Sequence, residues 1–506
     1  MKNSYAVKNT VSSLLVEFIA VISGIILPRF FTETYGSSVN GLVSSIGNFI
    51  TYLGLVEAGV SAAATVELYK PLANNDHDRI NEILSSAKGF YYRSGLAFLF
   101  FDALLIIGYP LIVKNEIADA SFIRMMILAL SISGIVDYFV LGKYRVLLVA
   151  DQKTYLIAIA QCVGTVVTLI SSLILIKLEV SSVIVKAVTG IVYILRTLYL
   201  VWKCRKMYGY LDFSRPYSSS AFPQRKSALF HQVVGMICNN TDIALLTVMI
   251  QSGALFEVSV YSAYNLVAAN LTTLFNSISK GVSATFGSIL AKEDETSLQN
   301  SFNLFELMYF ILLFIVYTCM GVFLYSFIVL YTQDYDDASL YPRIALVVLF
   351  TACGIVQNIR VPGSTVQVAA GHFKQTQGAA LIEAILNFGV SVALVRPIGI
   401  RGVLIGTLAA YLFRSTYVII YNANHFLHHT LFRTTVRFVV NLLLCGAMTA
   451  FGVFLIAPMI HSWLTWIVCA VPFFIGVSIV FVIVNYLIDA KNMKGCFQYA
   501  RRLIRK

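Results

Sequence analysis

The stretch TVSSLLVEFIAVISGIILPRFF, residues 10–31, decides the class of fold. It is apolar for long enough to cross the hydrocarbon core of a bilayer, which takes about 20 residues of α-helix. It also exceeds the apolar segment of a secretory signal, and no cleavage signal is evident beside it. We therefore expect this segment to be retained as the first of several membrane helices.

Similar apolar runs recur along the chain, with short polar segments between them. Of the 506 residues, 58% are hydrophobic and 12% are charged, whereas soluble domains carry about 25% charged residues. So little charge cannot cover the surface of soluble domains, and the sequence predicts an all-α integral membrane protein of about fourteen transmembrane helices. The predicted spans are residues 10–31, 41–66, 90–113, 121–141, 154–176, 181–202, 229–250, 258–280, 304–331, 341–361, 378–396, 400–421, 434–458 and 463–488.

Most of the 37 Lys and Arg residues fall in alternate loops between these spans. Cytoplasmic loops of membrane proteins are enriched in these residues, so the pattern predicts an even number of spans with both termini in the cytoplasm. The net charge of +12 suits contact with anionic membrane lipid. The basic residues do not gather on a soluble, aromatic-laced surface, which argues against nucleic-acid binding.

An internal repeat divides the spans into blocks of six, six and two. The sequence GVSAA at residues 59–63 ends the second span, and GVSAT at residues 281–285 ends the eighth. The same interval brings Lys70 onto Lys292. Blocks of six share one orientation, so we expect two parallel six-helix repeats that form two lobes around a central cavity. The expected domains are an N-terminal lobe (1–203), a cytoplasmic linker (204–228), a C-terminal lobe (229–425) and two additional helices with a basic cytoplasmic tail (426–506).

Ionisable residues inside the spans are the candidate site residues, because a charge in the hydrocarbon core is costly unless it faces a cavity or a partner. Arginine offers a planar fork of donors that suits phosphate oxygens. The candidates for substrate binding are Arg29, Arg196, Lys280, Arg360 and Arg414. The acidic candidates, for ion coupling or the cavity, are Glu17, Glu57, Asp242 and Glu383. The alternative is that these side chains snorkel to the interface or pair between helices.

Signals of an enzyme or of a metal site are weak. The chain has no nucleotide-binding loop, no Gly-x-Ser-x-Gly and no His-Glu-x-x-His motif. Its eight cysteines form no Cys-x-x-Cys pair. We interpret His425, His428 and His429, with Arg433 and Arg437, as a basic interfacial loop rather than a metal tract. The expectation is a protein that moves a substrate, without catalysis, a metal or a cofactor.

Degenerate motifs occur in a fixed order through residues 10–425. They are YGSSVNGL (35–42), YLGLVEAGV (52–60), NNTD (239–242), VSVYSAY (258–264), GHFK (371–374), EAILN (383–387) and GIRGVLIGT (399–407). Their order and spacing resemble the polysaccharide transporter, or Wzx-type flippase, branch of the multidrug/oligosaccharidyl-lipid/polysaccharide (MOP) exporter superfamily. The resemblance implies a fold like that of the MATE and MurJ transporters.

By the same resemblance, the protein flips a polyprenyl-pyrophosphate-linked oligosaccharide across the bacterial plasma membrane by alternating access. Cavity Arg and Lys residues would hold the pyrophosphate, and the glycan would be an O-antigen, capsule or exopolysaccharide repeat unit. Sodium, a proton or no coupling ion all fit, with Glu17 and Asp242 as possible ion sites. The alternatives are a lipid II flippase, a drug/cation antiporter with a more acidic cavity, and a membrane glycan polymerase or acyltransferase with longer outer loops.

Overall fold

A computed structural model describes residues 2–57, 60–113, 116–117, 119–215, 235–236, 240–292, 294–427 and 431–504. Within those ranges every regular element is helical. Eleven of the helices there are long and apolar enough to cross a membrane. The predicted all-α membrane fold is therefore confirmed, whereas the count of fourteen spans stays a prediction.

The chain folds into two compact units, Met1–Ser259 and Val260–Lys506, which we call unit 1 and unit 2. The predicted linker, 204–228, and the start of the seventh predicted span, 229–250, lie partly outside the described residues. The chain is helical at 240–249, after which α10 (Ala254–Leu290) begins in unit 1 and continues into unit 2. The predicted domain boundaries stay a prediction.

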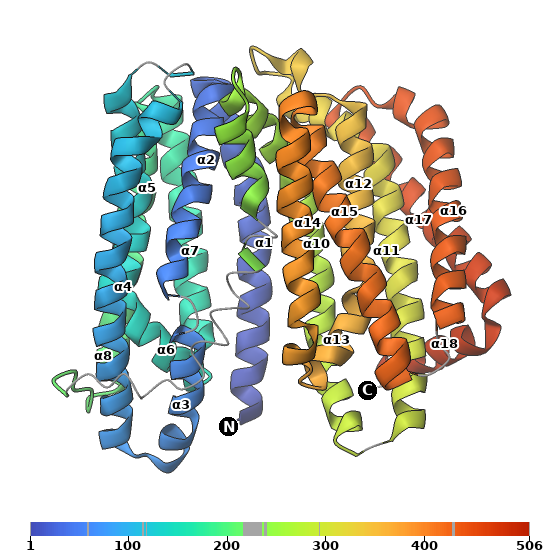
Figure 1. The fold of residues 1–506 in the computed structure, drawn as a ribbon, viewed down its shortest axis with the longest axis horizontal. Coiled ribbons are helices and arrows are strands. Elements are labelled where there is room, and N and C mark those ends of the chain that lie inside the picture. The colour runs from blue at the N-terminus through green and yellow to red at the C-terminus, as the bar shows by residue number, and fades with distance from the viewer. Residues whose placement is uncertain are drawn as a thin grey trace. The chain divides into compact units, whose positions relative to one another are not determined.

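Unit 1 is a bundle of long helices with two short ones at its breaks (Figure 1). Its helices are α1 (Lys2–Tyr35), α2 (Ser37–Leu53), α3 (Val60–Asn74), α4 (His77–Ile112), α5 (Ala120–Val136), α6 (Gly142–Ala150), α7 (Thr154–Lys177) and α8 (Ser182–Met207). The predicted span 41–66 is interrupted, because α2 ends at Leu53 and a 3-10 turn covers Gly54–Glu57 before α3. The fourth predicted span runs on past a π-helical turn, Asp137–Leu141, into α6.

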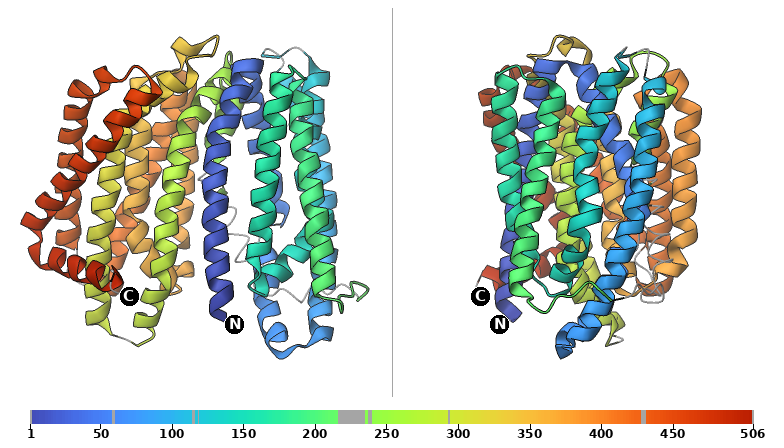
Figure 2. Two further views of the ribbon diagram at one scale, coloured as in Figure 1. Left: turned by 180° about the vertical axis from the view of Figure 1, so that it is seen from behind. Right: turned by 90° about the vertical axis from the view of Figure 1, so that its left-hand side faces the viewer.

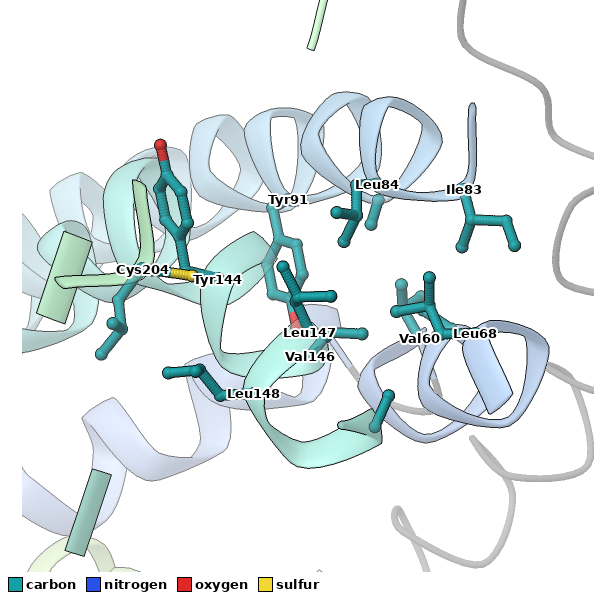
Figure 3. Packing of buried hydrophobic residues seen from close by; sticks show 14 of the residues in the cluster. Val60, Leu68, Ile83, Leu84, Tyr91, Tyr144, Val146, Leu147, Leu148 and Cys204 are labelled. Atoms are coloured by element: carbon teal, nitrogen blue, oxygen red, sulfur yellow. The ribbon is translucent and has the colours of Figure 1, made fainter. Parts of the chain in front are cut away.

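Buried side chains from α3, α4, α6 and α8 fill the space beside these breaks (Figure 3). Leu68, Leu84, Tyr91 and Leu147 are each at most 1% exposed. Gly142 lets the Tyr91 ring approach, since a Cβ at Gly142 would lie 2.5 Å from a Tyr91 ring carbon. The core therefore fixes the direction of Tyr91, which contacts a candidate site residue.

Unit 2 has a bundle that resembles unit 1 and three further helices. The bundle consists of α10, α11 (Glu295–Thr332), α12 (Ile344–Ile359), α13 (Val361–Ala369), α14 (Phe373–Ile398) and α15 (Ile400–Asn422). Next come α16 (Leu431–Leu455), α17 (Trp463–Ile488) and α18 (Ala490–Ile504), all packed on α11 (Figure 2). The C-terminal helices thus lie against one helix of the bundle.

Five consecutive helical segments of each unit follow the same plan. The pairs α4–α5, α5–α8 and α7–α8 pack in unit 1, and the pairs α11–α12, α12–α15 and α14–α15 pack in unit 2. Asp76 caps the start of α4, and Asp294 caps the start of α11, each by accepting a backbone N–H bond. The fourth span bends in both units, at the π-helical turn and at Arg360. These parallels support the predicted internal repeat.

Candidate functional site

Three of the predicted site residues meet inside unit 2. The Glu383 carboxylate of α14 accepts a hydrogen bond from Nη1 of Arg360 at 2.5 Å, and its second oxygen lies 3.6 Å from Nε of Arg414. The exposed fractions of these side chains are 7% for Glu383, 18% for Arg360 and 14% for Arg414. The single carboxylate of Glu383 therefore contacts two arginines from different helical segments.

The bend between α12 and α13 positions Arg360. Pro362 lies in the first turn of α13 and has no N–H for a helix bond, so the helix turns here at little cost. The Arg360 guanidinium then lies over Tyr411 of α15, with 5.2 Å from Cζ to the ring centre. Arg414 lies 5.7 Å from the ring centre of Tyr417 in the same way. Cation–π contacts therefore orient both arginines.

Pairing between helices was the alternative to a ligand site, and it describes part of this cluster. Arg360 and Glu383 form a close ion pair between the α12–α13 bend and α14. Arg414 lies farther from Glu383, and its Nη1 donates to the backbone carbonyl of Thr376 at 3.1 Å. Pairing between helices therefore holds Arg360 more closely than Arg414.

A second group of charges lies in unit 1, around the π-helical turn. The Tyr91 hydroxyl of α4 donates to the Glu57 carboxylate at 2.8 Å. Asp137 pairs with Arg145 of α6, and Tyr193 of α8 donates to Asp137 at 3.2 Å. Glu57 is the predicted acid that belongs to this group. The group thus holds two carboxylates, of which one pairs with Arg145 and the other accepts a hydrogen bond from Tyr91.

Arg196 of α8 lies beside that group without joining its ion pairs. Its Cζ is 4.3 Å from the centre of the Tyr193 ring. Its Nε is buried and has no hydrogen-bond acceptor, and no residue of the described ranges forms an ion pair with it. Gly164 of α7 faces it, since a Cβ there would lie 3.3 Å from Arg196 Cδ.

The other predicted site residues lie elsewhere. Asp242 is buried, next to Thr241, whose hydroxyl accepts a hydrogen bond from Tyr52 at 3.3 Å. Arg29 is half-buried in α1. Glu17 of α1 and Lys280 of α10 are exposed, and neither pairs with a described residue. Their roles in binding or ion coupling stay predictions.

One charged network that the sequence analysis missed fixes the last helices of unit 2. Arg437 of α16 is 2% exposed, and it donates to Glu306 of α11 at 2.7 Å and to Asp489 at 2.5 Å. Thr434 donates to the other oxygen of Glu306 at 2.7 Å. Burial raises the pKa of Asp489, but hydrogen bonds from Arg437 and Asn492 outweigh it, so this pKa lies below its usual value. Arg437 is therefore a structural residue, and its assignment to a basic interfacial loop was wrong.

The search for ionisable residues inside predicted spans would also have identified some of these buried acids. Glu306, Asp137 and Asp102 are acids inside predicted spans, and Asp102 is 3% exposed and accepts from Ser131 at 2.7 Å. No sequence signal paired Glu306 with Arg437, which lies on a distant helix. His428 and His429 lie outside the described residues, and His425 contacts the backbone carbonyl of Tyr421 at 2.9 Å. Within the described ranges no group of His, Cys, Asp and Glu could hold a metal ion.

Comparisons with known proteins identify structures that have a similar fold. No family model and no curated protein matches the chain. Among solved structures, the lipid II flippase MurJ in an inward closed conformation matches with a TM-score of 0.65 and 15% identity, over 94% of this chain and 98% of that one. An inward-facing MATE multidrug resistance transporter of the MOP superfamily matches with a TM-score of 0.64 and 11% identity, over 82% of this chain and 95% of that one.

The chain has the fold of MurJ and the MATE transporters. A MATE structure in a bent conformation also matches, with a TM-score of 0.52 over 87% of this chain and 97% of that one. The fold class expected from the sequence is thus confirmed. At sequence identities of 11–15% the similarity shows a shared fold and not a shared function.

Proposed function

We propose that the protein is a flippase for a polyprenyl-pyrophosphate-linked oligosaccharide, a repeat unit of O-antigen, capsule or exopolysaccharide. It would act in the bacterial plasma membrane by alternating access, with both termini in the cytoplasm and without catalysing a reaction. The lipid-linked oligosaccharide, membrane lipid and a Na⁺ or H⁺ coupling ion are its proposed partners. The fold supports a transporter, and the charges inside the spans support an anionic cargo.

The observation that carries the proposal is a set of half-buried arginines inside the apolar spans. Arg360 and Arg414 share the single carboxylate of Glu383. Arg196 has no carboxylate within ion-pair distance among the described residues. An arginine without an acidic partner inside an apolar span is costly, so Arg196 favours a ligand that brings negative charge. Pyrophosphate oxygens accept the forked hydrogen bonds that a guanidinium offers.

The proposed cargo has a charged pyrophosphate group and an apolar polyprenyl tail. The arginines would hold the pyrophosphate during translocation, and the polyprenyl tail would remain in the bilayer. A drug/cation antiporter is the second candidate, favoured by the half-buried Glu57 and the buried Asp242. A cationic drug, however, would be repelled by the arginine cluster of unit 2, which makes it the less suitable cargo. Lipid II shares the polyprenyl pyrophosphate and stays a close alternative.

The test is deletion of the gene followed by analysis of lipid-linked intermediates. We expect surface glycan to be lost and complete lipid-linked repeat units to accumulate on the cytoplasmic leaflet. Complementation with the double variant R360Q/R414Q should restore at most about a tenth of the glycan, because charge-assisted contacts to phosphate are lost. The matched control is R401Q, which removes an exposed arginine from α15, the helix of Arg414, and should complement fully.

Two outcomes would contradict the proposal. Normal surface glycan in the deletion strain would exclude an essential flippase for that glycan. Incomplete repeat units would indicate a defect in synthesis rather than in translocation. Accumulation of lipid II with unaltered repeat units would favour the lipid II alternative.

A further inference from the structure

A small cavity in unit 2 lies between the Arg360–Glu383 cluster and the network of Arg437. Its polar lining comes from four places in the fold: Glu306 of α11, Arg360 at the bend before α13, Asn422 at the end of α15 and Thr434 of α16. All other residues that line it are apolar or glycine. Its volume is about 10 Å³, which is room for one water molecule.

Asn422 brings to this cavity a side-chain amide that has no partner. The residue is 2% exposed, and neither its Nδ2 nor its Oδ1 forms a hydrogen bond with a described residue. Gly363 of α13 packs directly on the amide, since a Cβ there would lie 2.4 Å from Nδ2. A buried amide without hydrogen bonds is destabilising, so its position at the cavity favours a small ligand that can bond to it.

The charges around the cavity favour a neutral ligand. Glu306 accepts a hydrogen bond from Thr434 through one oxygen and from Arg437 through the other. Arg360, on another side of the cavity, pairs with Glu383. A cation would be repelled by the Arg360 guanidinium, and an anion would be repelled by the Glu306 carboxylate. Water both donates and accepts, and the carboxylate oxygens have lone pairs left for a further bond.

We propose that this cavity is a binding site for one water molecule, which bridges the side-chain amide of Asn422 to Glu306 and Arg360. The water accepts from the amide nitrogen or donates to the amide oxygen, and its remaining bonds reach the two charged groups. A buried water of this kind typically makes about three hydrogen bonds.

The bridge has a consequence for the candidate site. Glu306 is bonded to Arg437 of α16, whereas Arg360 belongs to the cluster with Glu383. The water therefore connects the bend that positions Arg360 to the helices that follow the internal repeat. Those last helices then support the geometry of the cluster from across the cavity.

The direct test is a crystal structure of the full-length protein at a resolution that shows buried waters. We expect one water peak within hydrogen-bond distance of the Asn422 amide and of Glu306 or Arg360. A map that shows other buried waters but no peak here would overturn the proposal. Crystals grown in Rb⁺ test for a cation, because an anomalous peak in the cavity would identify a bound monovalent cation and would also overturn the assignment to water.

A measurement in solution compares serine with alanine at two neighbouring asparagines. N422S keeps a hydroxyl that can bond to the water and N422A does not, and both side chains are too small to crowd Gly363. We expect N422S to unfold about 2 °C or more above N422A in detergent, because it keeps a hydrogen bond to the buried water.

The matched control is the same pair of substitutions at Asn424, which is exposed in the π-helical turn Ala423–Leu427. N424S should have no advantage over N424A, since solvent replaces any lost bond and alanine is the better helix former. If serine and alanine differ equally at both positions, Asn422 has no bound partner and the proposal fails. Neither experiment involves the cargo, so either result leaves the proposed function to its own test.

Discussion

Arginine side chains have different roles at different places in this chain, and the roles depend on their acidic neighbours. Arg437 is enclosed by Glu306 and Asp489 and holds helices together. Arg414 shares one carboxylate with Arg360. Arg196 faces Gly164 and has no acidic partner among the described residues. The number of acidic neighbours therefore distinguishes the three arginines.

At Arg437 we predict a large loss of stability from the single variant R437M. Removing one partner of a buried ion pair leaves the other charge uncompensated and costs about 3–5 kcal/mol. Glu306, whose side chain is 3% exposed in the natural protein, would keep one hydroxyl donor, Thr434. The measurement is thermal unfolding of the purified protein in detergent.

The double variant R437M/E306L is the control for that loss, because replacing both charges with apolar groups is often close to neutral. It should recover most of the stability that R437M loses. If the double variant is as unstable as the single one, packing rather than charge explains the effect, and the assigned role of the ion pair is wrong.

At the scale of elements, glycines set how closely α14 and α15 approach. Gly402 and Gly406 of α15 form a small-xxx-small pattern, which lets membrane helices pack backbone to backbone. A Cβ on Gly402 would lie 2.3 Å from the Leu394 carbonyl oxygen, and one on Gly406 would lie 2.7 Å from the Ser391 backbone nitrogen. This packing holds Arg414 against Glu383, so the geometry of the unit 2 cluster depends on it.

We predict that G406A destabilises the protein by about 1–3 kcal/mol, because the added methyl group meets backbone atoms that cannot move independently. The matched control is G389A in α14, where a Cβ meets nothing within 4 Å. G389A should be neutral or stabilising, since alanine favours a helix interior over glycine. Thermal unfolding of both variants decides the matter, and equal stabilities would contradict the proposed close packing.

At the scale of the whole molecule, the loop charges predict one orientation in the membrane. The alternation of basic and less basic loops predicts an even number of spans with both termini in the cytoplasm. The loop between α7 and α8, which contains Glu179, should then lie on the outer side. This orientation follows from the charges and is independent of the contacts within either unit.

Reporter fusions test that orientation. A reporter active only in the cytoplasm should be active at both termini and inactive when inserted after Glu179. A phosphatase active only outside the plasma membrane should show the reverse pattern. Activity of the same reporter at only one terminus would indicate an odd number of spans and would contradict the predicted topology.

The all-α membrane fold followed from the amino-acid sequence alone, because long apolar runs have few alternatives in a bilayer. The sequence also identified the repeat, and it named Arg360, Glu383 and Arg414 as ionisable residues inside spans. The sequence did not predict that these three side chains meet. They lie on segments whose approach depends on the bend before Pro362 and on glycine packing between α14 and α15. The break in the second span and the network of Arg437 likewise required the structure. An apolar run indicates that a segment is a helix, whereas packing determines which side chains of distant helices meet. The tertiary structure is therefore needed to distinguish the paired arginines from Arg196, which faces Gly164.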